Sequence, residues 1–169
     1  MVDLTVQIQQ PTTTSTTMIP PTHPGGRRGS FIVLEGVDRC GKTTQSQRLV
    51  QKLLAAGLAA TSWRFPDRTT ATGQIINEYL TNHQTNLSDQ AIHLLFAANR
   101  WEAPLQATLA KGTTIVCDRY AYSGVAFTAA KDNPDLSLDW CRAPDRGLPA
   151  PDCVLYLDLT PEQAAERGG

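Results

Sequence analysis

The sequence predicts an α/β fold in which a parallel sheet is flanked by helices. Residues 31–36 (FIVLEG) form an apolar, β-branched run that leads into a glycine-rich loop, and an amphipathic helical pattern follows. Further along the chain, strand-like and helix-like segments alternate, as they do when crossover helices join parallel strands. The length of 169 residues and the 41% hydrophobic composition suit one globular domain with a sizeable core.

The loop at residues 36–43 (GVDRCGKT) matches the phosphate-binding pattern G-x-x-x-x-G-K-[ST] at every fixed position. Glycines let successive backbone N–H groups point inward around a polyphosphate, and the helix N-terminus adds partial positive charge. In such loops the lysine reaches the β- and γ-phosphates and the threonine hydroxyl binds Mg²⁺. A chance match is the alternative, but a strand precedes the loop and a helix follows it. The residues expected to contact the nucleotide are Gly36, Asp38, Arg39, Cys40, Gly41, Lys42, Thr43 and Thr44.

Apolar periodicity and turn residues place the remaining elements. We expect Ser88 to cap the longest helix, and Lys111 with Gly112 to end it. The proline-rich stretch before the final strand is expected to be irregular. Thr160, followed by proline and a capping-box Gln163, is typical of a helix start. The expected elements are strands at 31–36, about 60–65, 113–118 and 153–159, and helices at about 43–56, 72–81 and 89–109.

Residues 1–29 are expected to be a disordered tail, separate from a domain at residues 30–169. Between Pro11 and Pro24 the chain holds six threonines and four prolines, followed by a Gly/Arg-rich segment. Such a segment buries too little apolar surface to offset the entropy of ordering it. It lacks the apolar core of a secretory signal.

Composition excludes several classes of function. A net charge of −1 argues against non-specific nucleic-acid binding, and no stretch approaches the roughly 18 apolar residues of a membrane helix. The four cysteines show no metal-ligand spacing, which indicates free thiols in a reducing compartment. Cys40 lies in the phosphate loop, where a lowered thiol pKa and a small loop-filling role are both open.

Further charged clusters follow the predicted strands. Phe65-Pro66-Asp67-Arg68 ends the second strand, and Asp118-Arg119 ends the third. Ligands of open parallel sheets bind beyond the carboxyl ends of the strands, so these clusters should converge on one cleft. Taken singly, each charge could be a solvated surface group and Phe96 a core residue. Together, Arg68, Arg100 and Arg119 suit a second phosphorylated substrate that faces the nucleotide.

Longer motifs resemble one family closely. FPDR, LLFAANRWE, DRYAYSGVAFTAAK and SLDWCRAPDRGLPAPD, together with the phosphate loop, resemble eukaryotic-type thymidylate kinase (dTMP kinase) across residues 31–169. The resemblance implies a P-loop nucleoside-monophosphate-kinase fold and transfer of a phosphoryl group from ATP to dTMP, giving dTDP for dTTP synthesis.

The resemblance also implies roles for individual residues on the ATP side. Lys42 and the loop amides would hold the ATP phosphates, and Arg39 would neutralise charge on the migrating phosphoryl group. Thr43 and Asp118 would hold Mg²⁺. The implied catalytic residues are Arg39, Lys42, Asp118 and Arg119.

On the dTMP side, the resemblance implies that Asp38 bonds the deoxyribose 3′-hydroxyl and that Arg68, helped by Arg119, binds the phosphate. Phe96 would stack on thymine while Arg100 bonds its edge. The implied substrate-binding residues are Asp38, Phe65, Arg68, Phe96, Arg100, Arg119, Gly124 and Phe127.

The resemblance breaks at the C-terminus, because family members continue past Gly169 with a lid, further helices and a last strand. We therefore expect a truncated member whose strand at 153–157 has a bare edge. Two alternatives stay open: a non-catalytic nucleotide-binding fragment, and a kinase with another deoxynucleotide or nucleoside acceptor. The resemblance also implies a homodimer, and we expect a cytosolic or nuclear location.

Overall fold

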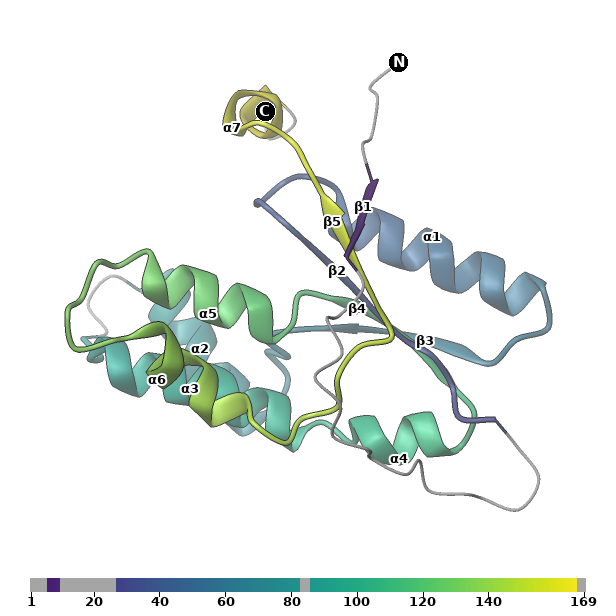
Figure 1. Cartoon of the computed structure of the whole chain (residues 1–169), viewed down its shortest axis with the longest axis horizontal. Helices are drawn as coiled ribbons and strands as arrows, with labels where there is room; N and C mark the ends of the chain where they lie inside the picture. The colour runs from purple at the N-terminus through teal and green to yellow at the C-terminus, as the bar shows by residue number, and fades with distance from the viewer. Residues whose placement is uncertain (1–5, 10–26, 83–85, 167–169) are drawn as a thin grey trace.

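A five-stranded sheet organises the chain in the computed structural model, which describes residues 6–9, 27–82 and 86–166. The strand order is β1-β5-β2-β4-β3 (Figure 1). The strands are β1 (Val6–Gln9), β2 (Phe31–Gly36), β3 (Ala60–Arg64), β4 (Thr114–Asp118) and β5 (Cys153–Leu157). The helices are α1 (Lys42–Ala55), α2 (Ala71–Thr81), α3 (Asp89–Glu102), α4 (Leu105–Ala110), α5 (Ala121–Ala129), α6 (Leu138–Arg142) and α7 (Pro161–Glu166), with a 3-10 turn at Ala143–Asp145.

Strands β2 to β5 run parallel, which confirms the predicted parallel sheet flanked by helices. Alternate side chains of a strand point to opposite faces. Phe31 and Val33 of β2 therefore join one hydrophobic cluster, and Leu34 joins another. Helix α1 packs on the second face and α4 on the first, so both faces of the central strands are buried.

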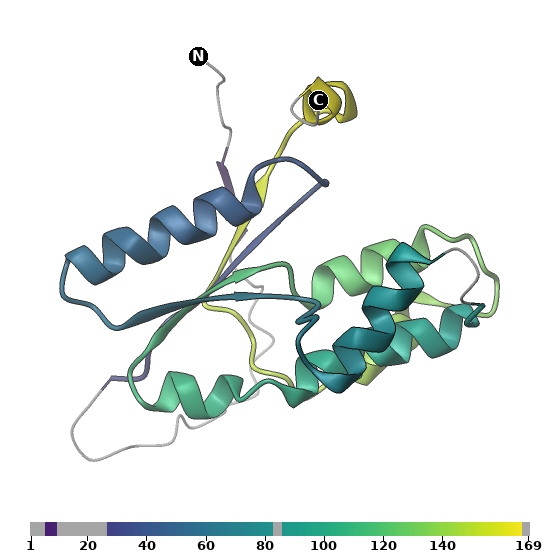
Figure 2. The ribbon, with the colours of Figure 1, turned by 180° about the vertical axis from the view of Figure 1, so that it is seen from behind.

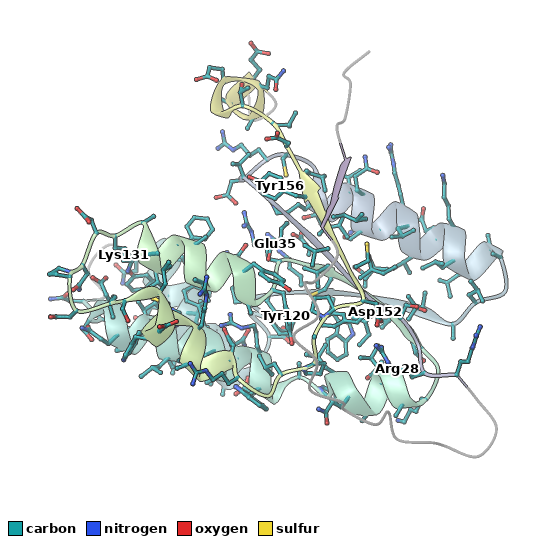
Figure 3. The ribbon with its side chains drawn as sticks, in the orientation of Figure 1. Arg28, Glu35, Tyr120, Lys131, Asp152 and Tyr156 are labelled. Carbon is teal, nitrogen blue, oxygen red and sulfur yellow. The ribbon has the colours of Figure 1, made fainter. Side chains whose placement is uncertain are left out.

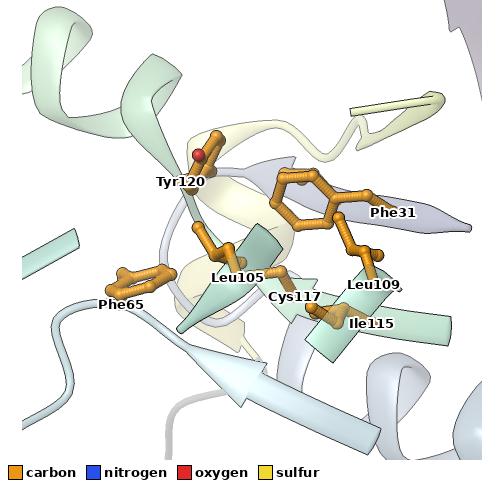
Figure 4. Packing of buried hydrophobic residues seen from close by; sticks show 8 residues of the cluster. Phe31, Phe65, Leu105, Leu109, Ile115, Cys117 and Tyr120 are labelled. Atoms are coloured by element: carbon orange, nitrogen blue, oxygen red, sulfur yellow. The ribbon is translucent and has the colours of Figure 1, made fainter. Parts of the chain in front are cut away.

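Figure 4 shows the cluster on the α4 side, where Phe31, Ile115 and Cys117 of the sheet meet Leu105 and Leu109 of α4. Helices α2, α3, α5 and α6 form a separate group beyond the carboxyl ends of β3 and β4 (Figure 2). The sheet thus supplies the strand ends, and the helical group supplies the surface that faces them.

The predicted helix at 89–109 is two helices, and this is a correction. Its start is confirmed, because the Ser88 hydroxyl accepts a hydrogen bond from the Ala91 amide at 3.2 Å. The break falls at Ala103, whose backbone is extended, before Pro104. Proline disfavours the helical conformation of the residue before it and lacks the N–H that would continue the helix.

The stretch before β5, expected to be irregular, contains α5 and α6, which is a second correction. Helix α5 starts at Tyr120 without a side-chain cap of its own. Instead, the Glu35 carboxylate accepts hydrogen bonds from the amides of Tyr120 and Ser123, at 3.0 and 3.2 Å. The cap comes from β2, far away in sequence, so no local start signal could reveal this helix.

Residues 6–9 differ from the expectation that residues 1–29 lack regular structure. They form β1, which pairs antiparallel with β5 from Val6 opposite Leu157 to Gln9 opposite Val154. An unpaired strand edge carries free N–H and C=O groups that a second strand can satisfy. The alternating sequence VQIQ suits that position, and it covers the edge of β5 that was expected to be bare. Arg28 and Gly29 also contact the domain, because Arg28 pairs with Asp152 and the Gly29 amide donates to the Leu109 carbonyl. The rest of the predicted tail, residues 1–5 and 10–26, and the last residues, 167–169, lie outside the described residues.

His93 of α3 makes hydrogen bonds to α5 and α6, so it connects three helices of the helical group. Its Nε2 donates to the Cys141 carbonyl of α6 at 2.8 Å, and its Nδ1 accepts from the Thr128 hydroxyl of α5 at 2.7 Å. The ring is fully buried and lies 5.2 Å from that of Trp140. Burial lowers the pKa of His93 below its usual value of 6.5 because it disfavours the charged ring.

We expect the folded state to lose stability as the pH falls below 6.5. The unfolded chain then binds the His93 proton before the folded chain does, with a limiting slope of about 1.4 kcal/mol per pH unit for one proton. Urea unfolding of the wild type and of His93→Gln between pH 7.5 and 5 measures this. The variant should be less stable at pH 7.5 but show a flatter pH dependence, and parallel curves would contradict the assignment.

Candidate active site

The phosphate loop joins β2 to α1 with a backbone that few residues could adopt. Gly36, Arg39 and Gly41 have φ angles of 140°, 64° and 97°. A Cβ on Gly36 would lie 2.5 Å from the Leu157 carbonyl oxygen, so this position has no room for a side chain. Helix α1 begins without a side-chain cap or an acidic residue in its first turn. Its free N–H groups therefore suit an anion.

Lys42 lies inside the loop, with only 5% of its surface exposed. Its ammonium group donates to the carbonyls of Gly36 and Val37, at 3.1 and 2.6 Å, and lies 3.6 Å from the Cys40 sulfur. The loop carbonyls thus hold the Lys42 ammonium group inside the loop, where a bound phosphate would contact it. Cys40 itself is buried and helps to fill the loop.

Thr43 and Asp118 bring the loop into contact with β4. The Thr43 hydroxyl donates to Oδ2 of Asp118 at 2.5 Å, while Arg64 Nε lies 3.9 Å from the same oxygen. The other oxygen, Oδ1, is buried without a hydrogen-bond partner within the part of the chain that the structure describes.

These oxygens fit Mg²⁺, which favours one or two protein ligands combined with waters and substrate phosphates. A buried, unsatisfied carboxylate oxygen next to a threonine hydroxyl is the donor set such a cation needs. Among the described residues, no group of three or more His, Cys, Asp or Glu side chains is arranged to hold a metal ion.

Arg119 links the phosphate loop to α5. Its Nη2 pairs with Asp38, and its Nη1 donates to the Ser123 hydroxyl at 2.8 Å. Ser123 in turn donates to Glu35 Oε2 at 2.5 Å. The guanidinium carbon also lies 5.3 Å from the centre of the Phe127 ring, which is largely exposed. The Arg119 side chain therefore contacts Asp38 of the loop and Ser123 and Phe127 of α5, so it links the two elements.

The backbone of Arg119 is unusual as well. Arg119 and Arg39 are two of the three non-glycine residues with positive φ that the described residues contain. A non-glycine residue with this backbone conformation costs the folded state about 1 kcal/mol, and it persists where surrounding contacts hold it. Both arginines border the same loop, so the strain lies where charge neutralisation is expected.

Tyr120 follows Arg119 directly and lies next to Glu35 (Figure 3). Its hydroxyl donates to the Pro149 carbonyl at 3.1 Å, and its ring packs against Phe31 and Phe65. Burial raises the pKa of Tyr120, and it also raises the pKa of the Cys117 thiol, so both stay neutral at physiological pH. Phe65, expected to border the substrate, is 4% exposed and belongs mainly to this core.

Arg68 lies at the border of a cavity of about 590 Å³, lined by residues 62–70 and by 99 and 102–104 at the end of α3. Its Nη1 donates to the Asn77 side chain of α2 at 3.0 Å. Phe65 lines this cavity too. The other residues expected to bind dTMP, namely Asp38, Phe96, Arg100, Arg119, Gly124 and Phe127, do not.

Arg100 is fully buried and paired rather than exposed. Its Nε and Nη2 donate to the two carboxylate oxygens of Asp145, at 2.8 and 2.7 Å. A Cβ on Gly124 would lie 3.1 Å from the guanidinium nitrogens, so glycine permits α5 to approach Arg100. Phe96, one helical turn earlier, is half-buried on α3.

The structure thus groups the predicted residues into three sets. Lys42, Thr43 and Asp118 form one, Asp38, Arg119 and Phe127 form another, and Arg100 with Gly124 forms the third. Each of the three arginines expected in one cleft has a different partner: Asn77 for Arg68, Asp145 for Arg100 and Asp38 for Arg119. The roles of these residues remain predictions.

Several residues that hold the site were not singled out from the sequence: Glu35, Asn99, Ser123 and Asp145. Glu35 carried a signal, because it is a charged residue at the end of an otherwise apolar strand. Asp145 carried none, since its partner is distant in sequence.

Comparison with known proteins assigns the family. The sequence profile described as "Thymidylate kinase" matches residues 34–169. The chain belongs to the thymidylate kinase family. It is 57% identical over 144 residues to the thymidylate kinase of Danio rerio and 56% identical to that of Homo sapiens, in each case over 84% of this chain.

A solved thymidylate kinase structure, from Candida albicans, superposes with a TM-score of 0.76 at 45% identity and covers 84% of this chain. The thymidylate kinase fold expected from the resemblance is therefore confirmed. The chain spans 66% of the length of the Danio rerio and human proteins and 53% of the Arabidopsis thaliana thymidylate kinase, to which it is 55% identical.

We expect Asp145→Ala to destabilise the fold by about 3 to 5 kcal/mol, because it leaves the buried Arg100 charge unpaired. The matched control is Asp139→Ala, whose pair with Arg142 is solvent-exposed at 4.0 Å. That change should cost less than about 1 kcal/mol. Urea unfolding of both variants measures the difference, and equal losses would contradict the assigned weight of the buried pair.

Proposed function

We propose that the chain transfers the γ-phosphoryl group of ATP to dTMP, giving ADP and dTDP. One observation carries the proposal: Arg119 pairs with Asp38 of the phosphate loop and also bonds Ser123 at the start of α5, so it joins the two elements. Two anionic substrates placed on either side of that pair would face each other. Membership of the thymidylate kinase family supports dTMP as the acceptor.

The donor half rests on α1 and its loop. ATP phosphates would bind the free N–H groups at the start of α1, and the Lys42 ammonium would leave the loop carbonyls to reach the β- and γ-phosphates. Arg39, exposed and fixed in a left-handed conformation, would neutralise charge on the migrating group. Transfer then consists mainly of alignment and charge neutralisation.

In the acceptor half, a phosphate oxygen of dTMP forms the new bond to the γ-phosphorus as the bond from that phosphorus to the β,γ-bridging oxygen of ATP breaks, and this oxygen leaves on the β-phosphate of ADP. The attacking oxygen already carries negative charge, so the reaction needs no general base. Arg119 and Arg68 would place that phosphate, while Phe96 and Arg100 would hold the base. Selection of thymine would rest on Arg100, because stacking tolerates any base.

Mg²⁺, when bound with ATP, supplies charge neutralisation at the phosphate oxygens. Thr43 and Asp118 would hold it, and the buried Oδ1 of Asp118 supports this role.

A second copy of the chain is the proposed protein partner. Helices α2 and α3 pack together and expose large apolar side chains, which a dimer interface on these helices would bury: Ile75, Leu80, Leu94 and Trp101. Among the described residues, no helix is long and apolar enough to cross a membrane. A cytosolic or nuclear location and the absence of nucleic-acid binding stay predictions.

A coupled assay of ADP release with ATP, Mg²⁺ and dTMP tests the proposed reaction. We expect turnover that needs dTMP and falls by about a hundredfold or more in Lys42→Ala, which removes charge from the phosphate site. The matched control is Lys52→Ala, on the exposed side of the same helix, which should retain wild-type turnover.

Other outcomes distinguish the alternatives. Turnover with thymidine but not with dTMP would indicate a nucleoside kinase. Binding of dTMP without any ADP release would indicate a non-catalytic nucleotide-binding chain, and either result would contradict the proposal.

A further inference from the structure

Asn99 is a buried polar residue that no role in the proposed reaction accounts for. It lies on α3, one position before Arg100, with 1% of its surface exposed. Its hydrogen bonds go to Asp67, Thr70 and Thr72. The side chain thus turns towards the loop that follows β3, which carries Arg68.

The Asn99 amide pairs with both backbone groups of Asp67. Oδ1 accepts from the Asp67 N–H at 2.7 Å, and Nδ2 donates to the Asp67 carbonyl at 3.0 Å. Only a side chain with a donor and an acceptor side by side can make both contacts. The backbone immediately before Arg68 is therefore fixed to α3.

Asn99 also fixes the helix that holds the Arg68 side chain. Nδ2 lies 2.9 Å from the hydroxyl oxygen of Thr70, the residue that caps α2 through the Gly73 amide. Helix α2 carries Asn77, which accepts from Arg68 Nη1. The Asn99 side chain therefore helps to position both the backbone before Arg68 and the helix that binds the Arg68 guanidinium.

Close packing makes this arrangement rigid. A Cβ on Gly73 would come within 1.8 Å of the Asp67 carbonyl oxygen, so α2 lies directly against the loop. That carbonyl is the oxygen to which Asn99 donates. The loop therefore has little freedom to shift while Asn99 is in place.

We propose that Asn99 is a positioning residue that sets the distance between the phosphate-binding Arg68 and the base-binding residues Phe96 and Arg100. The inference rests on the proposed function, because it takes Arg68 to bind the dTMP phosphate. The positions of all three proposed dTMP-binding residues then depend on α3, because Phe96 and Arg100 lie on that helix and Asn99 connects the Arg68 loop to it. A nucleoside without a phosphate does not use Arg68, so Asn99 matters only for the phosphorylated ligand.

The test compares binding of dTMP and thymidine to the wild type and to Asn99→Asp by isothermal titration calorimetry. The substitution keeps the shape of the side chain but sets an oxygen against the Asp67 carbonyl. We expect dTMP affinity to fall by about tenfold or more, since the Asp67 carbonyl then faces an oxygen in place of the Asn99 N–H, with thymidine affinity unchanged. In an Arg68→Ala background, Asn99→Asp should cause no further loss of dTMP affinity.

Asn133→Asp is the matched control. Asn133 also makes one donor and one acceptor contact, to Asp89 and to the Asp135 amide, but it lies in the loop after α5. It should lower the melting temperature without changing the ratio of dTMP to thymidine affinity. The melting temperature of Asn99→Asp, measured alongside, shows whether that variant is folded.

An unchanged dTMP affinity in Asn99→Asp would overturn the inference, and so would equal losses for dTMP and thymidine or an additive loss with Arg68→Ala. A wild type that binds neither ligand would overturn the proposed function itself, and the inference with it.

Discussion

The Glu35 carboxylate is the interaction on which the rest of the site depends. It is 6% exposed, and it accepts hydrogen bonds from the Tyr120 amide, the Ser123 amide and the Ser123 hydroxyl. A buried charge is tolerated only when it is so paired, and the start of a helix favours a negative group. Because Glu35 directly precedes Gly36, the phosphate loop and α5 share one anchor.

Through this anchor, the two halves of the site are built as one unit. The Ser123 hydroxyl donates to Glu35 and accepts from Arg119, so Glu35 helps to orient Arg119 through Ser123. Arg119 in turn pairs with Asp38 of the loop. Arg119 keeps a left-handed backbone because these contacts hold it. A site that aligns two anions needs such rigidity, since small displacements lower the rate of transfer steeply.

Local patterns in the sequence predicted much of the fold. The phosphate loop, the strand before it and the capping of α3 by Ser88 each depend on neighbouring residues, and each was found where expected. Elements fixed by distant contacts were not predicted. Helix α5 depends on Glu35, and β1 depends on the free edge of β5. The break before Pro104 had a local signal, which the long apolar pattern outweighed.

The candidate site shows the same division. Motif spacing indicated Lys42 and Thr43, the family resemblance indicated Asp118, and the structure brings Thr43 and Asp118 into contact. The partners that orient the site, such as Asp145 for Arg100 and Asn99 for the Arg68 loop, lie on other elements. Their side chains become recognisable only when the fold shows which buried groups need them.

The most direct test of this account is the equilibrium affinity of Glu35→Gln for dTMP, compared with the wild type and with the exposed Glu78→Gln. Glutamine keeps the size of the side chain but removes the charge that Tyr120, Ser123 and, through Ser123, Arg119 depend on. The account predicts an affinity lower by about tenfold or more in Glu35→Gln and unchanged in Glu78→Gln. Wild-type affinity in Glu35→Gln would contradict it.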